Sequence, residues 1–395
     1  MVSVNTKKQN TNSCGTVSIN SCGMVSADRN IFGQVWVIVA LFVFGLSGSP
    51  LLGQKPEVFW AGITYRGGVN ASDQYKYLFP QIEDSQGDLQ KFLKFYIRDN
   101  VANFTNIDLK YSEVMDEGSK YALSLVLSDE IVSTASIGDS HKLFVQLFFE
   151  IVVLDLQESK LINSIPIIIE LIDGRPHPYE DSDITSLILD MVNGEKSQLV
   201  EVIASKANKV RAIDSSTSTI QVKSMEIGDK VKSFSEPAGF GEMAYKRVVA
   251  QTINCLLSSQ LNVAILPYSI NSVNAKMALR LANQSKQFTI PEPTYAIDIN
   301  LEKYVKAKSK KSTDAQTLWL FGAYMNARVY EPSFNIEYFN QEVKAATSKT
   351  VPSNNDAVDD FANLSDTLKK VILNFADQTS KDKNVQQKVF EKCKL

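Results

Sequence analysis

Histidine and cysteine are scarce in this 395-residue chain, and their scarcity argues against several kinds of chemistry. It contains two histidines and four cysteines. It has no Cys-x-x-Cys pair, His-Glu-x-x-His helix, Gly-x-Ser-x-Gly elbow or phosphate-binding Gly-x-x-x-x-Gly-Lys loop. Gly239 and Gly241 precede a predicted helix but lack the third glycine of a dinucleotide-binding loop. The sequence therefore predicts no cofactor, and the balance of evidence is against an enzyme.

The two histidines lie in segments rich in turn-forming residues. His177 stands between two prolines, close to Asp173 and Glu180, where a metal site would need these groups to converge. His141 follows Ser140 in a predicted hairpin loop, but a Ser/His/Asp triad is assembled in space and is not shown by adjacency. We interpret both as solvated loop residues and predict no metal site and no catalytic residue.

Charge gives little indication of a partner, with one local exception. The formal net charge is -3, so nothing draws the whole chain to nucleic acid, and no nucleic-acid partner is expected. One basic cluster stands out, and alternate lysines within it would share a face on an extended arm: Lys303, Lys306, Lys308, Lys310 and Lys311. Lysines on a strand commonly protect an exposed sheet edge, whereas the same cluster also suits phosphate or anionic lipid.

Residues 1–53 have the pattern of a leader sequence. Residues 35–46 form an apolar run that is too short for a membrane span of about twenty residues, and small residues follow it up to Gly53. We expect a signal peptide that starts at Met24 and is cleaved near Gly53; an uncleaved anchor, and membrane contact only through it, is the alternative. Gln54 stands where a bacterial lipoprotein would have its lipid-bearing cysteine. The prediction is a periplasmic or secreted bacterial protein.

Export bears on the cysteines that would remain, Cys255 and Cys393. An oxidising compartment permits a disulfide between them. Cys255 falls within an amphipathic helical pattern, where a small buried thiol is the other interpretation. Both alternatives stay open at the level of sequence.

Two stretches, residues 121–127 and 295–301, share one pattern around which the chain is organised. Each begins with Tyr-Ala and then places an aliphatic residue on every second position, as a β-strand with one apolar side does. Each is followed by a polar segment and a longer strand-like run, at 143–156 and 318–330. The sequence predicts two related β-hairpins.

The flanking elements repeat in the same order, as expected from an internal duplication. Each half has a strand, a long amphipathic helix and a short strand before its hairpin: 58–65, 89–104 and 107–111, then 220–227, 245–257 and 263–268. A further helix carrying Val273, Met277 and Leu281 is predicted in the second half only. We predict an α+β fold of two related units, each an antiparallel sheet with helices on one face, and a C-terminal helix.

These patterns suggest five segments: a leader (1–53), a first α+β unit (54–181), a helical linker (182–216), a second α+β unit (217–350) and a C-terminal helix with its tail (351–395). The helix near 356–375 carries a narrow apolar stripe that includes Phe361, Leu368 and Phe375. Residues 380–395 are rich in lysine and have little to bury. The stripe either docks on the second unit or binds a partner.

The second unit resembles the periplasmic α/β domains of the curli-secretion lipoprotein family and the N-terminal domain of the TolB family. The resemblance rests on the helix at 245–257, the Val-Ala-Ile-Leu-Pro-Tyr strand at 263–268, a helix at 272–282, and the strands that begin at Tyr295 and Leu318. It covers about a quarter of the chain and implies a non-enzymatic part of an envelope assembly. The absent lipobox cysteine departs from the curli-type lipoproteins.

Together these patterns predict an exported, non-enzymatic cell-envelope protein that acts as a scaffold or assembly factor for a protein partner. The candidate interaction residues are the five lysines and the three stripe residues of the C-terminal helix. A secreted hydrolase that uses carboxylates and a module that binds a small ligand are the alternatives.

Overall fold

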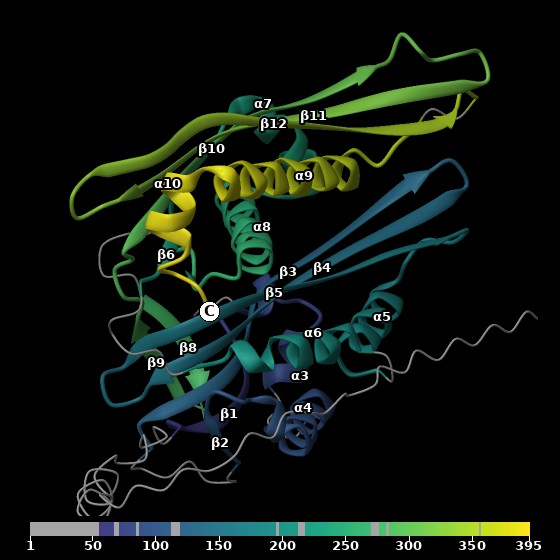
Figure 1. Ribbon diagram of the computed structural model, residues 1–395. Coiled ribbons are helices and arrows are strands. Elements are labelled where there is room, and N and C mark those ends of the chain that lie inside the picture. Colours follow the sequence, from purple (N-terminus) through teal and green to yellow (C-terminus); the bar gives the residue numbers. More distant parts are fainter. Residues whose placement is uncertain are drawn as a thin grey trace, which may run out of the picture. The chain divides into compact units, whose positions relative to one another are not determined.

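A computed structural model describes residues 55–66, 71–83, 87–111, 119–194, 197–211, 218–269, 276–281, 284–354 and 357–395. The predicted leader lies outside the described residues. By their contacts, residues Lys55–Leu395 form one compact unit (Figure 1).

Sheet 1 is built around three long antiparallel strands, with strand order β2-β1-β3-β4-β5-β9-β8. Its strands are β1 (Glu57–Tyr65), β2 (Asp108–Lys110), β3 (Tyr121–Ile137), β4 (Ser140–Asp155), β5 (Lys160–Arg175), β8 (Lys276–Leu281) and β9 (Gln284–Thr289). Strand β1 pairs parallel with both β2 and β3, and β5 pairs parallel with β9. The sheet is therefore mixed, and the predicted antiparallel pairing holds for β3, β4 and β5.

Sheet 2 has the order β12-β11-β10-β6-β7, which repeats the arrangement β5-β4-β3-β1-β2 of sheet 1. Its strands are β6 (Ile220–Ile227), β7 (Ile265–Leu266), β10 (Tyr295–Lys308), β11 (Gln316–Glu331) and β12 (Ile336–Pro352). Strand β10 pairs parallel with β6 and antiparallel with β11, as β3 does with β1 and β4. The two Tyr-Ala strands thus occupy equivalent positions.

The irregularities of the two sheets coincide as well. A bulge leaves Ser128 unpaired in β3 and Glu302 unpaired in β10, and each follows the first tyrosine of its strand by the same number of residues. A second shift of register falls at Val153/Leu154 in sheet 1 and at Val329/Tyr330 in sheet 2. A third lies where β1 and β6 pair with the Tyr-Ala strands, directly after the third residue of each. Because bulges re-aim a strand at a defined place, the matched shifts bend the two sheets at equivalent positions.

Helices follow the strands in the same way in both halves. The first half has α2 (Ala71–Gln74), α3 (Phe79–Glu83), α4 (Asp88–Asp99), α5 (Asp181–Asn193) and α6 (Gln198–Lys206). The second has α7 (Asp229–Ser235), α8 (Glu242–Leu261), α9 (Asp360–Lys381) and α10 (Lys383–Val385). Short 3-10 turns lie at Val101–Asn103, Ala207–Lys209 and Glu236–Ala238, and a π-turn at Gln386–Phe390.

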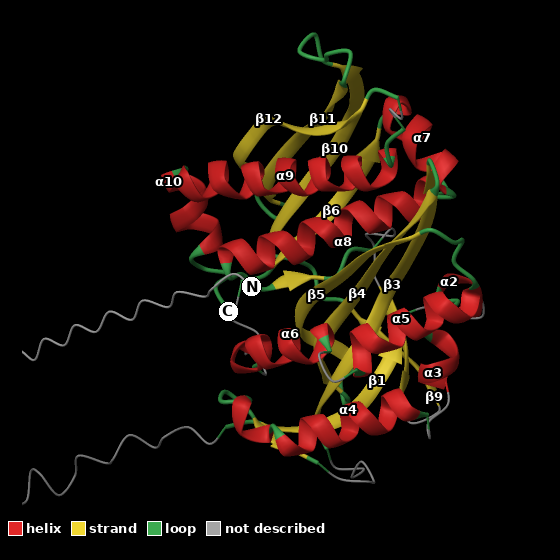
Figure 2. Ribbon diagram, turned by 90° about the vertical axis from the view of Figure 1, so that its right-hand side faces the viewer, coloured by secondary structure: helices red, strands yellow, loops and turns green. Residues whose placement is uncertain are grey.

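The layers alternate between helices and sheets (Figure 2). One face of sheet 1 shares a core with α4, α5 and α6, and one face of sheet 2 shares a core with α7, α8 and α9. A smaller cluster joins the other face of sheet 1 to the backs of α8 and α9. Among the residues that the structure describes, sheet 1 is therefore covered on both faces and sheet 2 on one.

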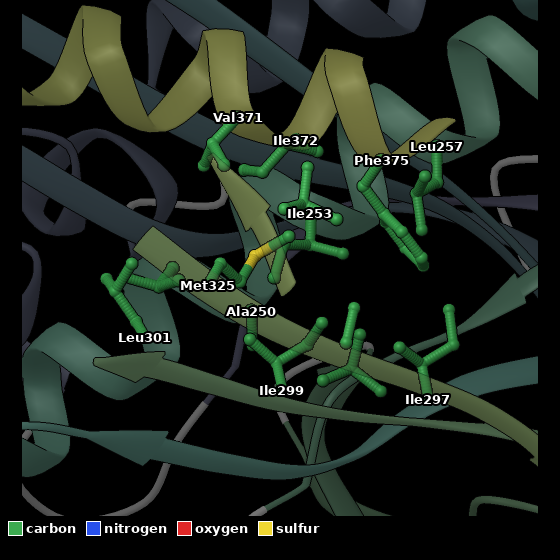
Figure 3. Packing of buried hydrophobic residues seen from close by; sticks show 14 of the residues in the cluster. Ala250, Ile253, Leu257, Ile297, Ile299, Leu301, Met325, Val371, Ile372 and Phe375 are labelled. Atoms are coloured by element: carbon green, nitrogen blue, oxygen red, sulfur yellow. The ribbon is translucent and has the colours of Figure 1, made fainter. Parts of the chain in front are cut away.

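The core of sheet 2 is filled by aliphatic side chains at helical and strand spacing. Ile297, Ile299 and Leu301 alternate along β10 and point toward the layer of α8 and α9 (Figure 3). Val371 and Phe375 of α9 are fully buried against them. Burial of such side chains is worth about 1.5 to 3 kcal/mol each, so this layer holds the second half together.

The predicted α+β class and the two hairpins are confirmed. The residues predicted as a linker form α5 and α6, which bury Ile184, Ile188, Leu199 and Ile203 in the first core. The segment therefore belongs to the first half, in the place that α9 and α10 hold in the second. The exact unit boundaries stay a prediction.

Two expectations need correction. The predicted helix with Val273, Met277 and Leu281 is, where the structure describes it, strand β8, which pairs antiparallel with β9. Met277, Leu279 and Leu281 also fit the two-residue spacing of a strand, and pairing with a neighbouring strand selected the strand over the helix. The C-terminal tail was expected to bury little, yet Cys393 is completely buried in the second core.

Candidate functional site

The uncovered face of sheet 2 is the first candidate surface. Its side chains form cross-strand rows, of which one is Lys303–Tyr324–Lys344 and the next is Val305–Gly322–Ala346. Leu320, one row further on, is 40% exposed and Val305 is 38% exposed. The face thus offers an aromatic ring between two lysines beside a shallow apolar strip.

In sheet 1, the equivalent row packs against helices of the same chain. Asp129, Phe148 and Ile168 pair across β3, β4 and β5 in the register of Lys303, Tyr324 and Lys344. Phe148 and Ile168 pack against α8 and α9, and Asp129 accepts a 2.6 Å bond from Arg247 of α8. The same place in the fold is an interface in sheet 1 and open in sheet 2.

The five predicted lysines lie at one end of sheet 2. Lys306 and Lys308 share a face of β10, as their alternation predicts, while Lys310 and Lys311 fall in the following turn. Lys303 lies over the ring of Tyr324 at 4.4 Å from its centroid. Lys306 lies 4.6 Å from the ring of Trp319 and forms a 2.7 Å ion pair with Asp360.

The three predicted stripe residues of α9 are packed inside the protein. Leu368 and Phe375 belong to the core of sheet 2. Phe361 is half-buried between the layers, where its ring stacks on Phe240 at 5.0 Å and meets Phe144 edge-on at 5.9 Å. Of the two interpretations of this helix, the packing matches the docking helix.

A polar pocket lies on the first half, between β3, α2 and the start of α5. It has a volume of about 370 Å³ and is lined by Gln74, Lys76, Tyr77, Glu130, Val132, Thr134, Tyr179, Asp181 and Ile184. At its mouth, Asp181 forms a 2.7 Å ion pair with Lys76 and accepts a 3.0 Å bond from the hydroxyl of Tyr77. Sequence gave no indication of this site, because Tyr77 and Glu130 are 53 residues apart.

The two carboxylates of the pocket are held differently. Glu130 accepts the backbone N–H of Tyr77 and of Leu78, one on each oxygen and both at 2.9 Å. Burial raises the pKa of Glu130 to about 7 despite these bonds. The hydrogen bond from Lys76 lowers the pKa of Asp181. Both oxygens of Glu130 are therefore engaged in fixing the turn before α3.

Three partly buried ion pairs join the two halves. Besides the Arg247–Asp129 pair, Lys369 of α9 lies 2.6 Å from Glu170 of β5, and Lys142 of β4 lies 2.9 Å from Asp359. Burial raises the pKa of Asp129, and Arg247 opposes the rise. Such pairs fix one docking geometry, because each would leave an uncompensated charge if the layers slipped.

The described histidines and cysteines lie in separate surroundings. Within the described ranges, no three His, Cys, Asp or Glu side chains gather as a metal site would require. His141 bonds to the hydroxyl of Ser136 at 3.0 Å across the β3–β4 turn. Cys255 and Cys393 are free, buried thiols in different clusters, and burial raises the pKa of both. In the same ranges, no helix combines the length and apolarity needed to cross a membrane.

Comparison with known proteins gives no family. No protein-family model and no curated protein matches the chain. A putative neuraminyllactose-binding hemagglutinin homolog from Helicobacter pylori is 12% identical, with 45% of this chain and 92% of that chain covered and a TM-score of 0.30. A minor lipoprotein from Acinetobacter baumannii is 10% identical over 43% and 93%, with a TM-score of 0.21.

A third solved structure, the rare lipoprotein B from Shewanella oneidensis, is 13% identical over 38% of this chain and 95% of that chain, with a TM-score of 0.22. Two of the three are bacterial lipoproteins, which agrees in part with the resemblance drawn from the sequence. At these identities and TM-scores, the similarities carry no argument about function.

Proposed function

We propose that this chain is an exported protein of the bacterial cell envelope that works by binding a partner on the open face of sheet 2, and not by catalysis. The export part rests on the apolar run at 35–46 and the small residues that follow it. The binding part rests on one observation: the two sheets share the order of five strands, and among the described residues both faces of sheet 1 pack against helices, whereas sheet 2 has helices on one face.

The open face has the features of a contact surface. Tyr324 presents a rigid aromatic ring, and Lys303 and Lys344 flank it. Aromatic residues, tyrosine among them, are enriched where proteins bind one another. The adjacent strip at Val305 and Leu320 is shallow, which suits a moderate and reversible contact.

Two measurements test this proposal. N-terminal sequencing of the mature protein from fractionated cells is expected to find cleavage near Gly53 in an envelope or secreted fraction. A photoreactive residue at Leu320 is expected to form a specific cross-link in cells, whereas one at Phe95, which is 50% exposed on α4, is not. A cytoplasmic protein, or equal cross-linking from both positions, would contradict the proposal.

A module that binds a small ligand is the second candidate, and the polar pocket favours it. The pocket brings an amide, two tyrosines, a lysine and two carboxylates around one space. A carboxylate-dependent hydrolase is less well supported, since both oxygens of Glu130 already accept backbone hydrogen bonds. A ligand that raises the melting temperature of the wild type but not of Asp181→Asn would support the second candidate.

A further inference from the structure

The end of sheet 2 that carries the lysines is far more basic than the chain as a whole. Residues 303–324 and 344–352, here called the lysine arm, contain one acidic residue, Asp314, in a chain of net charge -3. The lysines of the arm are Lys303, Lys306, Lys308, Lys310, Lys311, Lys344 and Lys349. This separation of charge is not explained by the packing of either core.

The arm repeats one arrangement on its two faces. On the open face, the row is Lys303–Tyr324–Lys344. On the opposite face, Trp319 pairs with Lys308 on one side and with Lys349 on the other. Lysine–aromatic–lysine rows therefore lie on both faces, and each ring has a lysine ammonium within 4.6 Å of its centroid.

Next to the Lys303–Tyr324–Lys344 row, the residues of the open face are small or apolar. Val305, Gly322 and Ala346 form one row, and Ala307, Leu320 and Ser348 the next. No carboxylate interrupts the strip, because the Glu302 side chain pairs with Asn326 on the far side of the Lys303 row. The open face thus has an apolar strip bordered by Lys303, Lys344 and the ring of Tyr324, whereas Trp319 lies on the opposite face and packs against the second core.

We infer that the lysine arm is a docking surface for an anionic lipid membrane, an inference that rests on the proposed function and names its partner. Lysines near an anionic surface gain electrostatic attraction while their aliphatic stems lie against apolar groups. Tyrosine and tryptophan favour the same boundary between water and lipid. An acidic protein would satisfy the lysines, but it would not require an aromatic ring beside an aliphatic strip.

Lysines that only protect a strand edge are the simpler explanation, and part of the geometry fits it. Strand β6 pairs with β10 only as far as Leu301, so the following residues of β10 form a local edge. Lys344 and Lys349 lie on β12, which is itself an edge strand of sheet 2, so edge protection accounts for their position but not for the tyrosine ring and the apolar strip beside them. The two explanations therefore differ in what charge reversal should do.

The test is co-sedimentation of the full chain with phosphatidylcholine vesicles that contain or lack phosphatidylglycerol. The variant Lys303→Glu/Lys308→Glu/Lys344→Glu leaves the Lys306–Asp360 pair intact. The control Lys91→Glu/Lys230→Glu/Lys383→Glu changes the net charge equally at other positions on the surface. Both keep the apolar N-terminal run, so any contribution of that run cancels in the comparison.

We expect binding that requires phosphatidylglycerol, weakens as salt rises, and falls about a hundredfold in the arm variant while the control changes little. Leu320→Ser should weaken binding several-fold with no change of charge. Equal losses in variant and control, or equal binding to vesicles without phosphatidylglycerol, would overturn the inference. So would an arm variant that keeps vesicle binding yet loses a cross-linked acidic protein; that result would leave the proposed function standing.

Discussion

Sheet 2 repeats the order of five strands of sheet 1 and has bulges at matching places, yet the central strands of the two sheets differ in burial. Strand β4 of sheet 1 is buried from Leu143 to Asp155 without interruption, whereas β11 of sheet 2 alternates between buried and half-exposed residues. A strand buried on both faces needs an almost continuous apolar run, and one that faces water needs alternation. The comparison teaches that side-chain pattern, and not topology, determines how many layers cover a sheet.

The largest effect is expected in the layer that both sheets share. Phe361→Ala/Leu368→Ala/Phe375→Ala removes apolar contacts from the cores on both sides of α9, at about 2 kcal/mol or more each, which should unfold the second half. Leu373→Ala, which is 37% exposed on the same helix, should cost less than about 0.5 kcal/mol. Chemical denaturation measures both. A triple variant that melts like the wild type would mean that α9 does not hold the layers together.

A matched pair of substitutions tests the two sheets directly. Phe148 and Tyr324 are equivalent by register, but Phe148 is 1% exposed between two layers and Tyr324 lies on the open face. Phe148→Ser should destabilise the protein by about 3 to 5 kcal/mol, because it leaves a cavity and buries a hydroxyl. Tyr324→Ser should cost about 1 kcal/mol or less. Similar losses at the two positions would refute the difference in coverage.

The buried ion pair between the halves offers a third test. Arg247→Met leaves Asp129 buried without its partner and should cost about 3 kcal/mol, most of which Asp129→Asn should restore in the double variant. The neighbouring Lys246 pairs with Glu242, which is more exposed, so Lys246→Met should cost less than about 1 kcal/mol. A double-mutant cycle gives the coupling. A double variant no more stable than Arg247→Met would show that the pair does not act as a unit.

The smallest effect concerns pH and is confined to the first half. The pKa of Glu130 is about 7 in the folded protein, above the ordinary 4.5, so the folded state holds this proton more tightly than the unfolded one. Its contribution to stability is complete below about pH 4.5 and is lost as pH rises through about 7, a fall on the order of 2 kcal/mol. Glu130→Gln lacks the titrating group and should not show this fall.

Unfolding free energies of wild type and Glu130→Gln at several pH values isolate the effect, because other groups titrate in both proteins. Parallel curves for the two proteins between pH 4.5 and 7 would show that the Glu130 proton is not linked to folding.

The sequence predicted the helices and strands better than it predicted how they pair and pack. Strand β6 begins and ends where the periodicity placed it, at 220–227, because its apolar spacing permits one interpretation. The bulges at Ser128 and Glu302 interrupt the apolar spacing of β3 and β10, as the step from Leu301 to Tyr304 shows, but the spacing alone does not give the register of the strands beyond them. The helix predicted around Met277 was wrong because its apolar residues fit both periods, and pairing with β9 selected the strand.

The candidate sites were predicted only in part. The lysine cluster was visible because its members are close in sequence, whereas Lys344 and Lys349 join it only through the pairing of β11 with β12. Arg247 and Asp129 are 118 residues apart, and nothing local in either segment indicates the other. The open face of sheet 2 could not be predicted, because it depends on which helices pack on which sheet, and a single sequence does not show that.

The central claim, that the open face of sheet 2 is the contact surface in the cell, is tested most directly by hydroxyl-radical footprinting of the purified chain and of intact cells. We expect Tyr324 and Leu320 to be labelled in the purified chain and several-fold less in cells, while Phe95 and Tyr179 are labelled alike in both. Equal labelling of Tyr324 in the two samples, with protection at Phe95 or Tyr179 instead, would contradict it.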